Sequence, residues 1–217
     1  MIKAIVFDFD GVILESLNLK AEAFKELYKE YGSKVSKKVV NHHLLNGGIS
    51  RYEKIKHYHN NFLNLPIDNK EINKIANNFS KIVKNKILKV PFVDGVENFL
   101  VNNYNNYLMF ISSATPLDEL KLICKNRSIE NYFKGIFGAP TSKEDHIKKI
   151  MSKWSLSNKE IVFIGDSISD YNASLFHNLF FIARITEENI FPLNQKYKLF
   201  DLTKLEQTIK RINKVKK

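Results

Sequence analysis

Aspartates follow two short apolar runs that lie far apart in the sequence. Asp8 and Asp10 come directly after the apolar residues 4–7, and Asp166 follows the apolar residues 161–164. Such runs predict buried parallel strands, whose carboxyl ends share one edge of an open α/β sheet, where ligands bind. Carboxylates gathered at that edge repel one another unless a cation joins them, and oxygen donors favour a hard cation. The sequence therefore predicts a Mg²⁺ site at the carboxyl edge of a parallel sheet.

The same aspartates suit phosphoryl transfer. An aspartate can attack a phosphate ester and form an aspartyl-phosphate intermediate, and Asp8 is the expected nucleophile. Because residues two apart on a strand face the same side, Asp10 is expected beside the reacting centre. There it can protonate the leaving oxygen and afterwards take a proton from water. The alternative is that both aspartates only form a turn or cap a helix.

The elements that position these residues follow from the hydrophobic pattern. Strands alternate with helices after residue 91, which is typical of a doubly wound α/β core. The expected strands cover 107–111, 135–137, 161–164 and 179–182, and the expected helices begin near residues 116, 143 and 169.

Residues 16–90 lack this alternation and predict a helical insertion instead. Their apolar residues recur at helical spacing, namely Leu19, Ala23, Leu27 and Tyr31, then Ile72, Ile75, Ala76, Phe79, Ile82 and Val83. We therefore divide the chain into an α/β core of residues 1–15 and 91–217 and an inserted helical domain of residues 16–90. Residues 204–217 predict an amphipathic helix that packs on the core.

Four short motifs, taken in order, resemble those of the haloacid dehalogenase superfamily of phosphohydrolases. They are Asp-Phe-Asp-Gly-Val at 8–12, a strand ending in Ser112-Ser113, Lys143 in Ala-Pro-Thr-Ser-Lys, and Gly-Asp-Ser-Ile-Ser-Asp at 165–170. Each motif alone is weak, but all four stand in the family's order on the expected elements. The resemblance implies that the fold is the superfamily's α/β core.

The resemblance also implies a role for each motif residue. Asp8 is the implied nucleophile and Asp10 the implied general acid and base. Implied ligands of the transferring phosphate are the Ser112 hydroxyl, with Ser113 as the alternative, and Lys143. The implied Mg²⁺ ligands are Asp8, the backbone carbonyl of Asp10, Asp166 and, directly or through water, Asp170. Taken singly, Lys143 would be a solvated surface charge and Asp170 a first-turn acid favoured by the helix dipole.

The helical insertion resembles the C1-type cap of phosphoglycolate phosphatase-like and β-phosphoglucomutase-like members. Such a cap closes over the site and excludes water. Residues 47–51, Gly-Gly-Ile-Ser-Arg, resemble the substrate-specificity loop of the β-phosphoglucomutase-like members, which implies that Gly48 and Arg51 contact the substrate. Arg51 offers a fork for a second phosphate, a carboxylate or a sugar hydroxyl. The alternative is a surface arginine on a helix that Ser50 caps.

The leading expectation is a Mg²⁺-dependent phosphatase that cleaves a small phosphorylated metabolite, such as a sugar phosphate or a phosphoglycolate-like compound. A phosphomutase is the alternative enzyme, although Lys20 stands where mutase-like members carry a histidine and Thr115-Pro116 where they carry a lysine. A haloacid dehalogenase does not need the second acid, Asp10. A non-catalytic binding protein on this fold would not need every reactive position filled.

Composition excludes several other classes. The net charge of +11 comes almost entirely from lysines scattered through the 217 residues, whereas a nucleic-acid surface shows a basic stripe with interleaved aromatics. No apolar run is long enough to span a membrane, and no signal-peptide pattern is present. Cys124 is the single cysteine, which excludes an internal disulfide. We expect a cytoplasmic protein with no specific nucleic-acid or membrane partner, and the sequence leaves open whether it is a monomer or a homodimer.

Overall fold

A single parallel sheet organises the protein. The computed structural model describes residues 1–186 and 190–215, and within them six parallel strands lie in the order β3-β2-β1-β4-β5-β6. The strands are β1 (Ala4–Phe7), β2 (Leu108–Pro116), β3 (Gly135–Ala139), β4 (Ile161–Gly165), β5 (Phe180–Arg184) and β6 (Lys198–Leu199). The central strand β1 pairs with β2 on one side and with β4 on the other. The predicted doubly wound parallel core is therefore confirmed.

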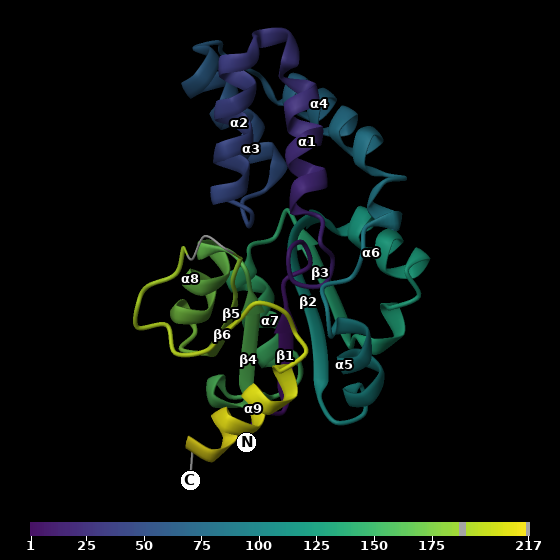
Figure 1. Cartoon of the computed structure of the whole chain (residues 1–217), viewed down its shortest axis with the longest axis vertical. Coiled ribbons are helices and arrows are strands. Elements are labelled where there is room, and N and C mark those ends of the chain that lie inside the picture. The colour runs from purple at the N-terminus through teal and green to yellow at the C-terminus, as the bar shows by residue number, and fades with distance from the viewer. Residues whose placement is uncertain (187–189, 216–217) are drawn as a thin grey trace.

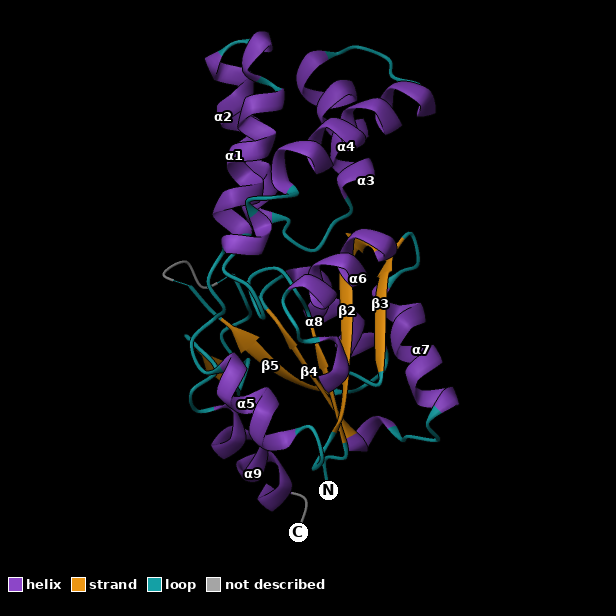
Figure 2. Ribbon diagram, turned by 90° about the vertical axis from the view of Figure 1, so that its right-hand side faces the viewer, coloured by secondary structure: helices purple, strands orange, loops and turns teal. Residues whose placement is uncertain are grey.

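Helices cover both faces of the sheet (Figure 2). Alternate residues of β1 face opposite layers, because successive side chains of a strand point to opposite sides. Ile5 and Phe7 pack in the apolar cluster with α5 (Val96–Asn103), α6 (Leu117–Asn126) and α9 (Leu205–Val215). Ala4 and Val6 pack in the cluster with α7 (Lys143–Lys153) and α8 (Ile168–Phe176). A strand buried on both faces must be apolar throughout, which is why residues 4–7 read as a continuous hydrophobic run.

The structure departs from the sequence expectation at two strands. Strand β2 continues to Pro116, beyond the expected end at residue 111, and the two-residue strand β6 was not expected. The C-terminal helix packs on the core as predicted, with Leu205, Ile209 and Ile212 fully buried. Residues 216 and 217 of its predicted span lie outside the described residues.

The helical insertion follows β1 and lies over the carboxyl end of the sheet (Figure 1). It contains α1 (Leu17–Leu27), a 3₁₀ turn η1 (Lys29–Tyr31), α2 (Ser33–Leu45), α3 (Arg51–His57), a π-helical turn η2 (Tyr58–Leu63), α4 (Asn69–Val83) and a 3₁₀ turn η3 (Ile87–Lys89). These elements fall within the expected residues 16–90 and form a helical cap. Its centre is aromatic, since the ring of Phe24 lies 4.4 Å from that of Phe79 and 5.6 Å from that of Tyr58.

A core arginine holds the linker that leads into the cap. Arg184, the last residue of β5, donates from Nη2 to Oε1 of Glu15 at 2.5 Å and from Nε to the carbonyl of Phe200 at 3.1 Å. Glu15 precedes α1, so this contact ties the start of the cap to the sheet.

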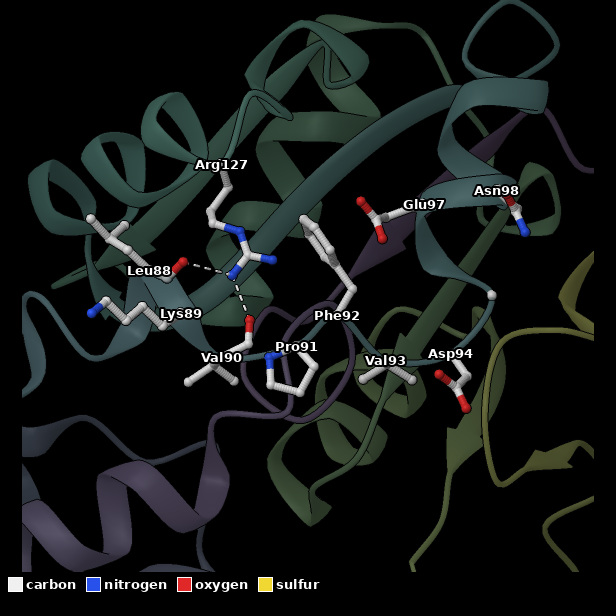
Figure 3. Close-up of a pocket in the computed structure, with 11 residues that line it drawn as sticks. Leu88, Lys89, Val90, Pro91, Phe92, Val93, Asp94, Glu97, Asn98 and Arg127 are labelled. Carbon is white, nitrogen blue, oxygen red and sulfur yellow. Dashed lines mark hydrogen bonds between the residues drawn. The ribbon is translucent and has the colours of Figure 1, made fainter.

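A second core arginine holds the linker that leads back. Arg127 donates from Nη1 to the carbonyl oxygens of Val90, at 2.5 Å, and Leu88, at 3.2 Å, and its guanidinium lies 4.0 Å from the ring centre of Phe92 (Figure 3). The open pocket around this arginine has a volume of about 500 Å³ and is lined by residues of the linker, α5 and Arg127. It includes none of the motif aspartates.

Among the described residues, no helix is long and apolar enough to cross a lipid bilayer.

Packing around Phe24 gives a test of the cap. Phe24 is 1% exposed, whereas Phe176 on α8 is 73% exposed. Phe24→Ala should lower the free energy of unfolding by about 3–5 kcal/mol, because it removes a buried ring. The same truncation at Phe176 should change it by less than about 0.5 kcal/mol. Urea titration of both variants measures the difference, and similar losses would contradict a core centred on Phe24.

Candidate active site

Two adjacent strands bring Asp8 and Asp166 to one place. Phe7 pairs with Ile164, and the next residue, Asp8, still donates its backbone N–H to the carbonyl of Ile164 at 2.9 Å. Asp166 follows one residue after β4, and Asp170 lies in the first turn of α8. One carboxylate oxygen from each of these three aspartates lies within 4.8 Å of the others. The sequence prediction that distant aspartates meet at the carboxyl edge is therefore correct for these residues.

Lys143 lies between two of these carboxylates. It is the first residue of α7, and its Nζ lies 3.1 Å from Oδ2 of Asp8 and 2.5 Å from Oδ1 of Asp170. Only 6% of the residue is exposed, so the alternative of a solvated surface lysine is wrong. Helix α7 begins here because the Ser142 hydroxyl accepts the N–H of Asp145 at 3.1 Å.

Asp170 is satisfied on both oxygens. Its Oδ2 accepts from the Ser167 hydroxyl at 2.5 Å and from the Ser167 N–H at 3.0 Å, which makes a capping box at the start of α8. Its Oδ1 faces Lys143. Asp170 therefore stabilises the start of α8 and holds Lys143. Both of its oxygens already have partners, Ser167 for Oδ2 and Lys143 for Oδ1.

Asp166 is the poorly satisfied member of the cluster. Its Oδ1 is buried and has no hydrogen-bond partner among the described residues. Burial, and then the charges of Asp8 and Asp170, raises its pKa well above the usual range. A side chain at position 11 would overlap Oδ2 of Asp166, and the backbone there has a φ of +79°. Gly11 is thus required by both space and conformation.

Charge is unbalanced at this edge. The pKa of Asp8 is raised to about 7 by burial and by the charge of Asp170, even though the ammonium of Lys143 lowers it. Three carboxylates surround one ammonium, and one buried oxygen of Asp166 is unpaired. A hard divalent cation with oxygen ligands fits these donors, since it would neutralise the excess charge and use the free oxygen.

Asp10 has partners of its own, away from the cluster. Its Oδ2 accepts from Nζ of Lys20 at 2.5 Å and from Oγ1 of Thr115 at 2.9 Å, and its Oδ1 accepts from Oγ of Ser16 at 2.6 Å. Burial alone would raise the pKa of Asp10, but the Lys20 ammonium and these hydrogen bonds bring it to about 2. Its carboxylate is therefore ionised and points toward the start of the cap.

Lys20 and Thr115 were missed as site residues by the sequence analysis, which used them only as departures from the mutase pattern. Lys20 lies one helical turn before Phe24 on the buried side of α1, and Nζ of Lys20 also contacts Oγ1 of Thr115 at 2.8 Å. A lysine placed on an apolar helical stripe was the available signal, because burying an ammonium requires a partner.

The two serines of β2, Ser112 and Ser113, face different neighbours. Oγ of Ser112 lies 2.9 Å from Nδ1 of His146 on α7, and the serine is fully buried. Oγ of Ser113 accepts the N–H of Thr115 at 3.1 Å, and its own proton has no acceptor among the described residues. Which of these hydroxyls holds a phosphate stays a prediction.

The Gly-Gly-Ile-Ser-Arg loop touches the core on two sides. Arg51 is 6% exposed and forms a fork with both carboxylate oxygens of Glu119 on α6, at 2.9 and 2.8 Å. It also donates to Oγ of Ser80 at 2.6 Å. A Cβ at Gly48 would overlap the Ser169 hydroxyl of α8. The surface-arginine alternative is wrong, although Ser50 does cap α3 by accepting the N–H of Glu53 at 3.3 Å. Contact of Gly48 and Arg51 with substrate stays a prediction.

Comparisons with known proteins agree with this architecture. The chain matches the haloacid dehalogenase-like hydrolase family over residues 5–183. β-Phosphoglucomutase from Clostridium difficile is similar in structure, with a TM-score of 0.81, 20% identity and 99% of each chain covered. A predicted phosphatase from Clostridium acetobutylicum has a TM-score of 0.78 at 18% identity, covering 97% of this chain and 99% of that one. A predicted phosphoglycolate phosphatase from Haemophilus somnus has a TM-score of 0.74 at 16% identity, covering 96% of this chain and 98% of that one. A comparison with curated proteins found no match.

These structural matches share too little sequence to show more than a common fold, whereas the family match carries the assignment. It spans most of the chain and includes Asp8, Lys143 and Asp166, which meet at the carboxyl edge of the sheet. The chain belongs to the haloacid dehalogenase-like hydrolases.

Proposed function

We propose that this hydrolase is a Mg²⁺-dependent phosphatase that cleaves a small phosphorylated metabolite through an aspartyl-phosphate on Asp8. The observation that carries the proposal is the position of Asp8. Its carboxylate is buried at the end of the central strand, 3.1 Å from the Lys143 ammonium and within the acidic cluster. The proposal assigns to these neighbouring groups the nucleophile, a cation for phosphate oxygens and the donors for a metal.

In the first half of the proposed reaction, each of these residues has a separate role. Oδ1 of Asp8 accepts the N–H of Phe9 at 2.7 Å, which fixes the carboxylate plane. An Asp8 oxygen attacks phosphorus, and the bond from phosphorus to the ester oxygen breaks. Lys143 binds an equatorial phosphate oxygen, and one of the hydroxyls of Ser112 and Ser113 binds another. Ser113 is the better candidate, because the Ser112 hydroxyl is engaged by His146.

A bound Mg²⁺ would neutralise the carboxylates and the phosphate oxygens. Its proposed ligands are Asp8, Asp166 and the backbone carbonyl of Asp10. Asp170 is proposed to hold Lys143 in place through their ion pair. The unpaired Oδ1 of Asp166 supports this set.

Asp10 is the proposed carrier of protons. The leaving oxygen needs a proton, so Asp10 must be protonated and separate from Lys20 before it can act as an acid. The ionised form seen beside Lys20 and Thr115 suits the second half, in which Asp10 takes a proton from water as that water attacks the aspartyl-phosphate. Lys20 thus favours the base form of this residue.

The cap is proposed to exclude water while the phosphate is transferred. A cytoplasmic location is a further prediction, as is a small phosphorylated metabolite as the partner. A phosphomutase remains the alternative on the same site. Incubation with a sugar 1-phosphate separates the two activities, because a mutase yields the isomeric sugar phosphate and a phosphatase yields inorganic phosphate.

Loss of the nucleophile tests the covalent route. Asp8→Asn should lower the rate of phosphate release from p-nitrophenyl phosphate by about a thousandfold or more, because the aspartyl-phosphate no longer forms. Asp118→Asn, at an exposed acid on α6, is the matched control and should leave the rate unchanged. Mass spectrometry must show that the introduced asparagine has not deamidated back to aspartate. Near-normal turnover in an intact variant would end the proposal.

Removal of the metal tests the acidic cluster. EDTA should abolish phosphate release and added Mg²⁺ should restore it, because the ion offsets the excess of buried carboxylates. Mg²⁺ should also raise the Tm of the wild-type protein by mass action. The rise in Tm should be much smaller for the Asp166→Asn variant, and for the Asp118→Asn variant it should equal that of the wild-type protein. Full activity in excess EDTA, together with a Tm that ignores Mg²⁺, would remove the metal assignment.

A further inference from the structure

Lys54 is a buried lysine that the reaction described above does not use. It lies on α3, is 2% exposed and lines the narrow cleft between cap and core together with Asp10, Lys20 and Thr115. The cleft has a volume of about 30 Å³, which is room for about one or two water molecules. Lys54 thus lies in a narrow cleft that Asp10 also lines.

Lys54 differs from the other buried cations of the cleft in its partner. Lys20 and Arg51 each contact a carboxylate, of Asp10 and Glu119 respectively. Within residues 1–186 and 190–215, no carboxylate oxygen lies within 4.0 Å of Nζ of Lys54. Its hydrogen-bond partner is Nδ1 of His43, at 2.9 Å. The ammonium is therefore held in place by a neutral group.

His43 does not act as a counter-ion. It is 3% exposed and its ring lies 5.0 Å from that of Phe24. Burial, and then the charge of Lys54, holds the pKa of His43 well below its usual range. The imidazole is therefore neutral, and its Nδ1 accepts a hydrogen bond from the Lys54 ammonium. His43 orients Lys54 and does not compensate its charge.

A buried ammonium without a carboxylate in direct contact is costly to the folded protein. Burial, and next the repulsion from Lys20, lowers the pKa of Lys54 to about 7. An anion in the cleft would stabilise the charged form, and the fixed position of the ammonium would spare that anion the cost of ordering a flexible side chain. The fork of Arg51 is occupied by Glu119, so Lys54 is the better-placed cation of α3 for a ligand.

We propose that Lys54, held by His43, binds the distal anionic group of a substrate that carries a carboxylate or a second phosphate besides the reacting phosphate. This inference rests on the proposed function, because it assumes that the reacting phosphate lies at Asp8. Lys20 also lines the cleft, but its ammonium is paired with Asp10. The ligand enters when the cap opens, and its two anionic ends then join core and cap as the cleft closes.

Matched pairs of compounds test the proposal. 2-Phosphoglycolate is compared with 2-hydroxyethyl phosphate, and glucose 1,6-bisphosphate with glucose 1-phosphate, since the members of each pair differ in the distal anion. Affinities are measured by calorimetry on the Asp8→Asn protein with Mg²⁺, so that binding is judged without turnover. kcat/KM on the enzyme with Asp8 intact is a separate measurement, and its failure alone would count against the proposed function and leave the binding result standing.

The doubly anionic member of at least one pair should bind at least about tenfold more tightly, the effect of one charge-assisted contact. Lys54→Met should reduce that ratio to about one, while Lys56→Met, at an exposed lysine of the same helix, should keep it. Lys54→Met should fold, because it removes an unpaired buried charge; Lys54→Gln replaces it if circular dichroism shows otherwise. The proposal falls if no pair shows a preference, if the Lys54 variants keep it, or if Arg51→Met alone abolishes it.

Discussion

Excess negative charge at the carboxyl edge of the sheet is the constraint around which the rest of the structure is arranged. Strands β1 and β4 must be adjacent for Asp8 and Asp166 to meet, and the turn after β1 requires glycine because Asp166 leaves no space for a side chain. The partial remedy is Lys143, which α7 buries between Asp8 and Asp170. One ammonium does not balance three carboxylates, and this excess of negative charge is the basis of the proposed metal site.

Core and cap carry opposite charge toward the cleft that separates them. The core supplies the aspartates, whereas the cap supplies Lys20, Arg51 and Lys54. The cap cations therefore add positive charge opposite the aspartates, which would favour the anionic substrate proposed above. Asp10 lies at the boundary and is the member of the core that a cap residue, Lys20, already neutralises. Closure is also marked by the contact of Arg51 with Glu119, which joins α3 to α6.

The sequence was sufficient for features that depend on local pattern and on sheet geometry. Apolar runs predicted the strands, and the shared edge of parallel strands predicted that Asp8 and Asp166 meet. It was insufficient where a side chain chooses between partners distant in the sequence. The direction in which Asp10 points depends on Lys20 and Thr115 together, and the fork of Arg51 depends on Glu119, 68 residues away. No periodicity encodes such pairs. The two-residue strand β6 was missed because it is too short to carry a pattern.

The distribution of arginine has a consequence for how the sequence of this protein can change. Lysine supplies nearly all of its positive charge, and the chain has four arginines, of which Arg51, Arg127 and Arg184 all lie where the cap meets the core. Each planar guanidinium makes contacts that an ammonium does not reproduce. Arg51 donates two hydrogen bonds to one carboxylate, Arg127 donates to two carbonyls and stacks on a ring, and Arg184 donates to a carboxylate and a carbonyl. Replacement of arginine by lysine should therefore be tolerated over most of the surface but not at these three positions. The three arginines thus mark the contacts that connect the cap and its linkers to the core.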